Sequence, residues 1–289
     1  MLQVLSIIFP VFAIVLAGFV YARRHGPDMA SANRLNLEIF TPALIFSVLA
    51  AKDFDLLRYA DLAGAGGLVV LGSGLLAWPV ARLAGWEART FLPPMMFNNS
   101  GNMGLPLALF AFGEDALPAA MILFLVENTL HFTVGNAMLT RRINPLALLR
   151  MPMLVATLAG IAVSLTAVEV PKPLYEAIHL LGQVAIPLML FSLGVRMTGI
   201  GFADWRIGLA GALIAPLTGL ALAWLAAQGL QMHGQQAAQL LLFGALPPAV
   251  LNFMLAERYE VEPQRVAAIV LLGNFASVLI IPAVLYLVL

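Results

Sequence analysis

Residues 91–110 read FLPPMMFNNSGNMGLPLALF, an apolar stretch long enough to cross a bilayer but interrupted by prolines, glycines and amides. Proline removes a backbone donor and glycine removes stiffness, so we expect the helix to open around residues 98–101. A second half-helix would then begin near Ser100 with free N–H groups, which favour an anion. Open backbone at that depth is tolerated only where it faces protein or a water-filled cavity. The stretch therefore predicts a polar binding site inside an interrupted membrane helix.

A second apolar stretch, LLLFGALPPAVLNFMLAERY at residues 240–259, carries similar punctuation. Its Pro-Pro pair at 247–248 matches the pair at 93–94 at an offset of 154 residues, and Asn252 matches Asn98 at the same offset. Interrupted helices at corresponding positions of two halves are the best sequence pointer to a transporter's binding site. We therefore expect both stretches to contribute to one site.

The composition describes a membrane protein with many spans. The chain has 289 residues, of which 62% are hydrophobic and 10% charged, whereas a soluble domain has about 25% charged residues. The formal net charge is zero, so nothing indicates a nucleic-acid partner. The absence of cysteine excludes structural disulfides and Cys-ligated zinc. The first apolar segment lacks a basic start and a cleavage site, so it is interpreted as a span and not a signal peptide.

Ten candidate spans follow one another with short connections. They cover residues 2–22, 34–51, 60–84, 90–112, 116–139, 151–168, 174–197, 206–228, 236–257 and 264–289. The longest polar break lies near residues 140–150, so the expected halves are residues 1–140, with helices one to five, and 141–289, with helices six to ten.

The basic residues predict the orientation, because Lys and Arg concentrate in inside loops. With the N-terminus outside, twelve arginines fall inside and three basic residues fall outside. The inside set is Arg23, Arg24, Arg34, Arg82, Arg89, Arg141, Arg142, Arg150, Arg196, Arg206, Arg258 and Arg265. The outside set is Lys52, Arg58 and Lys172. Both termini then lie on the outer side of the inner membrane. Each half contains five spans, an odd number, so the two halves insert with opposite topology.

Further matches in chain order extend the repeat. They pair Pro10 and Leu16-Ala17-Gly18 with Pro152 and Leu158-Ala159-Gly160, Pro42 and Phe46-Ser47 with Pro187 and Phe191-Ser192, Leu76-Ala77-Trp78 with Leu222-Ala223-Trp224, and Asn128 with Asn274. The predicted fold is an all-α polytopic membrane protein. Its ten transmembrane helices form two inverted five-helix repeats, in which helices four and nine are broken crossover helices.

The candidate site residues come mainly from the two interruptions. The candidates for substrate binding are Asn98, Asn99, Ser100, Asn102, Asn252, Phe253 and Ser47. The candidates for the crossover or hinge are Pro93, Pro94, Gly101, Gly104, Pro106, Pro247 and Pro248. Alternatively, these residues only kink and cap helices in a packed bundle, but three asparagines and a serine within five residues favour binding. No Arg or Lys falls in the predicted site, so the positive field would come from backbone dipoles.

Glu127 is the carboxylate predicted to lie deep in the membrane. Asn128 follows it, and His131 lies one turn later on the same helix face. A buried carboxylate is usually protonated, paired or cation-bound, so the three residues are candidates for a sodium or proton coupling site. The alternatives are a structural Glu–His hydrogen bond or a Glu nearer the interface. No metal site or cofactor is expected, and no intramembrane enzyme motif is present.

Three segments resemble one known family. NSGNMGLPL at residues 99–107, NFMLAERYEVEP at 252–263 and LNLEIFTPALIFSVLA at 35–50 resemble the auxin efflux carrier family. That family includes plant PIN-type auxin exporters and bacterial permeases for malate and malonate. The resemblance extends over essentially the whole chain.

The resemblance implies a fold related to bile-acid sodium symporters. Helices one, two, six and seven would form a scaffold that mediates homodimerisation, and helices three to five and eight to ten would form a transport domain that slides like an elevator. Asn98 and Asn252 would fall at the crossover, where plant members typically have proline. Asn99 would fall where members place an asparagine that meets the substrate carboxylate. A site with these asparagines suits a small hydrophilic substrate.

These observations predict an inner-membrane secondary transporter for a small organic anion. The cargo would be a mono- or dicarboxylate such as malate or malonate, or an auxin-like weak acid. Its expected partners are this anion, the lipid bilayer and a second copy of the chain. One alternative is a sodium- or proton-coupled symporter of the bile-acid type that uses Glu127. A more remote alternative is a membrane sensor or channel, although soluble signalling domains are missing.

Overall fold

The computed structural model describes residues 2–51, 54–140, 151–166, 168–199 and 204–289. These residues form helices and no β-strand, apart from one isolated antiparallel bridge, which confirms the all-α prediction. The predicted boundary between the halves at 141–150 lies outside the described residues, with Arg141, Arg142 and Arg150. Lys52 of the predicted outside set lies outside them too.

The helices of the first part of the chain are α1 (Leu2–His25), α2 (Ala30–Leu35), η1 (Asn36–Phe40), α3 (Thr41–Leu49), η2 (Leu57–Tyr59), α4 (Ala60–Leu83), α5 (Ala88–Met96), η3 (Ser100–Gly104), α6 (Leu105–Phe112), η4 (Glu114–Ala116), α7 (Leu117–Leu130), η5 (His131–Gly135) and α8 (Asn136–Thr140). Those of the second part are α10 (Pro152–Thr166), α11 (Lys172–Gln183), α12 (Ala185–Arg196), η6 (Met197–Gly199), α13 (Trp205–Gly229), α14 (Gly234–Ala245), α15 (Val250–Arg258) and α16 (Pro263–Val288).

Several of these helices suit a bilayer. Within the described residues, six continuous helical segments are long and apolar enough to cross a membrane by length and composition. They are Val4–His25, Leu57–Leu83, Glu114–Thr140, Lys172–Arg196, Trp205–Gly229 and Pro263–Val288. Shorter apolar helices cover Ser100–Phe112 and Pro152–Thr166. The molecule is therefore a polytopic membrane protein.

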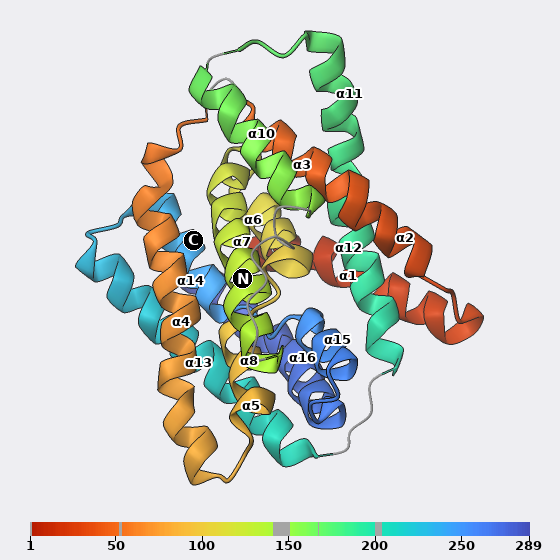
Figure 1. The fold of residues 1–289 in the computed structure, drawn as a ribbon, viewed down its shortest axis with the longest axis vertical. Coiled ribbons are helices and arrows are strands. Elements are labelled where there is room, and N and C mark those ends of the chain that lie inside the picture. The colour runs from red at the N-terminus through yellow and green to blue at the C-terminus, as the bar shows by residue number, and fades with distance from the viewer. Residues whose placement is uncertain (1, 52–53, 141–150, 167, 200–203) are drawn as a thin grey trace.

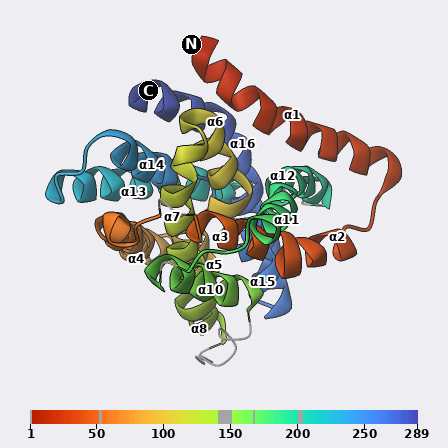
Figure 2. The same ribbon diagram turned by 90° about the horizontal axis from the view of Figure 1, so that it is seen from above.

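The helices gather into two groups with a central layer between them. Figures 1 and 2 show α4, α13 and α14 on one side, α1, α2 and α12 on the other, and α6 and α7 between. In the first group α13 packs against α4, α14 and α16, whereas in the second α1 packs against α12, and α3 packs against α10 and α11. The two interrupted helices pack mainly with the first group, with α5 against α4 and α13 and α14 against α13, while η3 also contacts α12 of the second group.

Two helix pairs in the second group approach closely at glycines. A Cβ atom built on Gly18 of α1 would lie 2.1 Å from the carbonyl oxygen of Phe191 in α12. A Cβ atom built on Gly160 of α10 would lie 2.8 Å from Cβ of Leu49 and 3.5 Å from the carbonyl oxygen of Phe46, both in α3. Small residues let membrane helices approach backbone to backbone, which explains these glycines.

The two interruptions cross each other and share their hydrogen bonds. Helix α5 ends at Met96 and η3 begins at Ser100, while α14 ends at Ala245 and α15 begins at Val250. The extended segments between them form the antiparallel bridge, in which Asn98 lies opposite Pro248. The Asn99 N–H donates to the Pro247 carbonyl at 2.7 Å, and the Ala249 N–H donates to the Phe97 carbonyl at 3.0 Å. Each opening therefore satisfies backbone groups that the other exposes.

The two Pro-Pro pairs, which match in the sequence, lie at different places relative to the crossing. Pro247 and Pro248 lie in the second interruption, but the pair at 93–94 lies inside α5, before the first one. The Pro93 carbonyl still accepts the Phe97 N–H at 2.9 Å, so the helix continues past both prolines. The offset of 154 residues thus pairs positions in different local structure, and Pro93 and Pro94 lie in the last turns of α5 before the opening and not in it.

Candidate functional site

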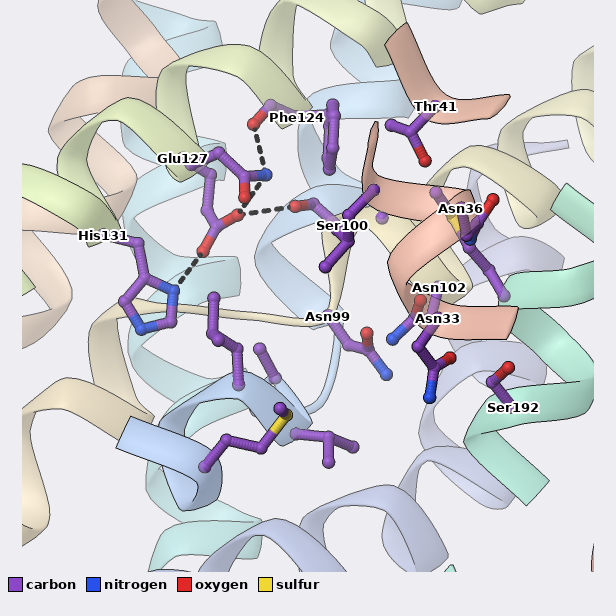
Figure 3. Close-up of a pocket in the computed structure, with 18 of the residues that line it drawn as sticks. Asn33, Asn36, Thr41, Asn99, Ser100, Asn102, Phe124, Glu127, His131 and Ser192 are labelled. Atoms are coloured by element: carbon purple, nitrogen blue, oxygen red, sulfur yellow. Dashed lines mark hydrogen bonds and ion pairs between the residues drawn. The ribbon is translucent and has the colours of Figure 1, made fainter. Parts of the chain in front are cut away.

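A pocket of about 140 Å³ lies beside the crossing, between the two groups of helices. Figure 3 shows its wall from the first interruption in the centre, α7 on one side, and α2, η1, α3 and α12 on the other. It is lined by Asn33, Asn36, Leu37, Thr41, Asn98, Asn99, Ser100, Gly101, Asn102, Phe124, Glu127, Asn128, His131, Met153, Met189, Ser192, Arg196, Ala249, Val250, Leu251 and Met254.

Two asparagines of the first interruption leave polar atoms unused in this pocket. Asn99 is 2% exposed, and its side-chain Nδ2 has no hydrogen-bond partner among the described residues. Asn98 donates through Nδ2 to the Phe243 carbonyl at 2.8 Å, while its Oδ1 has no partner there. Because buried amides are normally hydrogen-bonded, a free amide donor facing a pocket indicates a ligand with an acceptor oxygen.

Backbone donors from both interruptions face the same pocket. The Met103 and Gly104 N–H groups donate to the Asn99 carbonyl, at 3.0 and 3.1 Å. The N–H groups that start η3 and α15 have no such bond in the described structure, and their residues line the pocket. Residues from the N-terminal turns of both helices therefore line one pocket, and the positive end of a helix dipole favours an anion.

The Glu127 carboxylate lies on the α7 side of the pocket. The sequence analysis predicted some of the polar residues around it. Glu127 is 2% exposed, and its Oε2 accepts Ser100 Oγ at 2.8 Å and Asn128 Nδ2 at 3.2 Å. His131 Nδ1 lies 3.4 Å from Glu127 Oε1, within ion-pair distance if the imidazole is protonated, although the geometry is not that of a hydrogen bond. The carboxylate thus joins α7 to the start of η3, as the dashed lines in Figure 3 show.

His131 connects this cluster to the crossing. Its ring stacks on Phe97 of the first interruption, with centroids 4.1 Å apart and planes within 6°. Its Nε2 has no partner among the described residues, and the side chain is 1% exposed. Within the described residues, no group of three or more His, Cys, Asp or Glu could hold a metal ion. The cluster thus places a buried carboxylate and an imidazole beside the pocket.

The opposite wall consists of residues that the sequence analysis did not select. Asn36 and Thr41 are buried in η1 and α3, and Ser192 is buried in α12. Asn36 Oδ1, Thr41 Oγ1 and Ser192 Oγ have no partner among the described residues. Asn33 and Asn36 are three residues apart, so they share a helix face, and this spacing was the available sequence signal.

Arg196 corrects the expectation that no Arg or Lys lies in the site. It ends α12 and lines the pocket, four residues after Ser192 on the same helix face. Its Nη1 lies 2.9 Å from the Met254 sulfur in α15. Sequence reasoning counted Arg196 only as an inside arginine, because a position at the end of a span says nothing about what packs across from it.

The structure brings together four of the seven predicted substrate residues, all three predicted coupling residues and one predicted hinge residue, Gly101. Asn98, Asn99, Ser100, Gly101, Asn102, Glu127, Asn128 and His131 all line the pocket. Gly104 packs with its would-be Cβ 2.9 Å from Leu246 Cδ1, and Pro106 lies in the first turn of α6.

Three predicted substrate residues lie outside the pocket lining. Asn252 is in the first turn of α15, not at the crossing, and its Nδ2 donates to the Phe97 carbonyl at 2.8 Å and the Ala249 carbonyl at 3.0 Å. Phe253 packs against the core instead. Ser47 donates to the Leu44 carbonyl at 3.0 Å and lines a separate cavity of about 660 Å³. Asn252 therefore does not lie opposite Asn98 in the bridge, where Pro248 lies.

An all-helical membrane fold with a polar pocket at two crossing interruptions defines a membrane transport protein. A family model described as "Membrane transport protein" matches residues 137–285. The chain belongs to this family, the PIN-like auxin efflux family of membrane carriers. It is 28% identical over 313 residues, covering 100% of this chain and 97% of the relative, to a protein of Rhizobium meliloti (strain 1021) named "Putative malonate transporter".

Proposed function

We propose that this protein is a secondary transporter that carries a small organic anion, a mono- or dicarboxylate, across the inner membrane. The unpartnered Asn99 Nδ2 in the pocket carries the proposal, because it offers a donor to a carboxylate oxygen. The N-termini of η3 and α15 add backbone donors without a fixed charge from either interruption. The name of the Rhizobium meliloti relative agrees with an anionic cargo.

The proposed architecture is two inverted five-helix repeats, with helices four and nine broken at the crossover. Three local correspondences support it. The sequence repeat matches Gly18 with Gly160 and Phe191 with Phe46, and in the structure Gly18 approaches Phe191 as Gly160 approaches Phe46. Asn128 Nδ2 donates to the Phe124 carbonyl four residues earlier, and Asn274 Nδ2 donates to the Val270 carbonyl four residues earlier. The crossing itself is antiparallel, as expected for related segments of opposite direction.

The proposed mechanism is an elevator, in which a transport domain slides against a dimeric scaffold. The division of helix contacts supports this, since α1, α3, α10, α11 and α12 pack mainly with one another, while α4, α13, α14 and α16 form the other group. The pocket lies between the groups, with Arg196 and Asn33 on the scaffold side. If the arginine-rich ends are inside and both termini outside, the pocket lies toward the inside, which corresponds to an inward-facing state.

The first experiment compares Asn99→Ala with Asn136→Ala in the purified full chain. Asn136 lies in α8 and is not part of the pocket lining, so it controls for the loss of an amide. We expect Asn99→Ala to fold normally, because its backbone carbonyl keeps both helix bonds, and to lose carboxylate affinity by about tenfold or more. Ligand-induced thermal stabilisation and uptake into vesicles measure this. Unchanged malonate uptake by Asn99→Ala would rule out the assignment.

A second candidate function is cation- or proton-coupled symport through Glu127. The burial of Glu127, with Ser100, Asn128 and His131 as neighbours, favours it, because an intramembrane carboxylate is a common coupling group. The coupling ion would be sodium or a proton.

Glu127→Gln separates coupled from uncoupled transport. Under symport, uptake depends on sodium or on pH in the wild type, and this dependence disappears in Glu127→Gln, which cannot ionise. Glu257→Gln, a change at an exposed position near the end of α15, serves as the control. If the initial uptake rate of the wild type depends on neither sodium nor pH, coupled symport is excluded.

A further inference from the structure

The guanidinium of Arg196 is a positive group in the pocket that lacks an anionic partner. Arg196 is partly buried, and no described Asp or Glu lies within ion-pair distance of it. The recorded side-chain contact, to the Met254 sulfur, is to a weak acceptor and engages one of the five N–H donors of the guanidinium. The remaining donors are therefore available to a negatively charged ligand group in the pocket.

The pocket therefore has two separate regions that favour negative charge. One is formed by Asn99 Nδ2 and the backbone donors of η3 and α15. The other is formed by Arg196 and, one turn earlier on α12, the unpartnered hydroxyl of Ser192. In Figure 3 Ser192 lies on the opposite side of the view from Glu127 and His131, with Asn99 and Asn102 between them.

Apolar residues also line this pocket. Val250, Leu251 and Met254 from α15 and Met189 from α12 line the same pocket. These side chains can contact the methylene groups of a ligand. A ligand with two carboxylates joined by a short hydrocarbon chain can present one carboxylate to each region and its methylene groups to the apolar residues.

We propose that Arg196 binds the second carboxylate of a short-chain dicarboxylate and makes the dianion the preferred cargo. This inference rests on the proposed function and adds the substrate class and a specificity-determining residue. A guanidinium can bind a carboxylate with two parallel hydrogen bonds, which an amide or a methyl group in its place cannot accept in the same way. Since α12 and the interruptions belong to different helix groups, the bound dicarboxylate also bridges the two groups.

The test measures binding of malonate and of its monoamide, malonamate, to the purified full chain. The two ligands have nearly the same shape but differ by one charge at neutral pH. The variants are Arg196→Gln and Arg196→Lys, with Arg206→Gln as the control, because Arg206 is exposed at the start of α13 and is not part of the pocket lining.

We expect Arg196→Gln to weaken malonate binding about ten- to a hundredfold and to leave malonamate binding unchanged. Arg196→Lys keeps a charge without the paired donors, so it should retain part of the preference, and it serves as the test if Arg196→Gln does not fold. Arg206→Gln should bind both ligands like the wild type.

Two results would overturn the proposed role of Arg196 and leave the proposed function intact. One is an equal loss of affinity for both ligands, which indicates a structural role, and the other is a wild type that binds both ligands equally well. A wild type that binds neither ligand would overturn the proposed function as well, so the two failures are distinguishable.

Discussion

The two interruptions cross at one point, but their chemistry differs. The first places amides and a hydroxyl in the pocket from Asn98, Asn99, Ser100 and Asn102. The second opens at Pro247 and Pro248 and faces the pocket through apolar residues: Ala249, Val250, Leu251 and Met254. The two segments therefore differ in what they place at the pocket: the first places polar side chains there, and the second places apolar ones.

This difference explains why an asparagine and a proline lie opposite each other in the bridge. Neither the Asn98 N–H, as far as the described structure shows, nor the proline nitrogen of Pro248 donates to a backbone carbonyl there. The backbone donors of the crossing are the N–H groups of the following residues, Asn99 after Asn98 and Ala249 after Pro248. The backbone therefore permits proline at either position, and the side chain is free to be selected for other reasons.

Substitution of Asn252 should have the larger effect on the frame. We expect Asn252→Leu to lower the free energy of unfolding by about 1–2 kcal/mol, because it removes two buried hydrogen bonds, to the Phe97 and Ala249 carbonyls. Substrate affinity should not change, since Asn252 is not part of the pocket lining. Thermal unfolding and ligand binding on the same preparation measure both quantities.

Gln228→Leu is the matched control, because Gln228 is exposed in α13 and the change is chemically the same. It should leave the unfolding midpoint near that of the wild type. If Asn252→Leu instead kept full stability and lost affinity, the second interruption would contribute a side chain to binding, and the contrast between the two segments would fail.

Local signals predicted the parts of the fold that local chemistry determines. The first opening and the start of its second half-helix at Ser100 follow from prolines, glycines and asparagines within a few residues. The pairing of the two openings does not follow, because the register of a crossing depends on tertiary contacts. The Pro-Pro match at one offset was therefore misleading, since α5 accommodates Pro93 and Pro94 within its last turns.

The candidate site shows the same division. Glu127 and His131 are one turn apart on one helix, so their proximity could be predicted from spacing. The bond from Ser100 to Glu127 joins residues of different helices and could not. Arg196, Asn36 and Thr41 enter the pocket from α12, η1 and α3, whose packing against the crossing no sequence pattern records.

Substitution of Asn98, in the bridge itself, should have the smallest effect on stability. Asn98→Pro should change the free energy of unfolding by less than about 1 kcal/mol, since it loses one side-chain hydrogen bond, to the Phe243 carbonyl, and no backbone bond recorded in the structure. The preceding residue, Phe97, already has φ −103° and ψ 103°, a conformation that proline tolerates in its neighbour. Carboxylate affinity should fall only a little, because Asn99 and the backbone donors remain.

Asn98→Ala separates the loss of the amide from the introduction of the ring, and its unfolding midpoint should match that of Asn98→Pro. If Asn98→Pro unfolds far more easily than Asn98→Ala, the first interruption requires a backbone that proline cannot adopt. The two segments would then differ in conformation as well as in side chains.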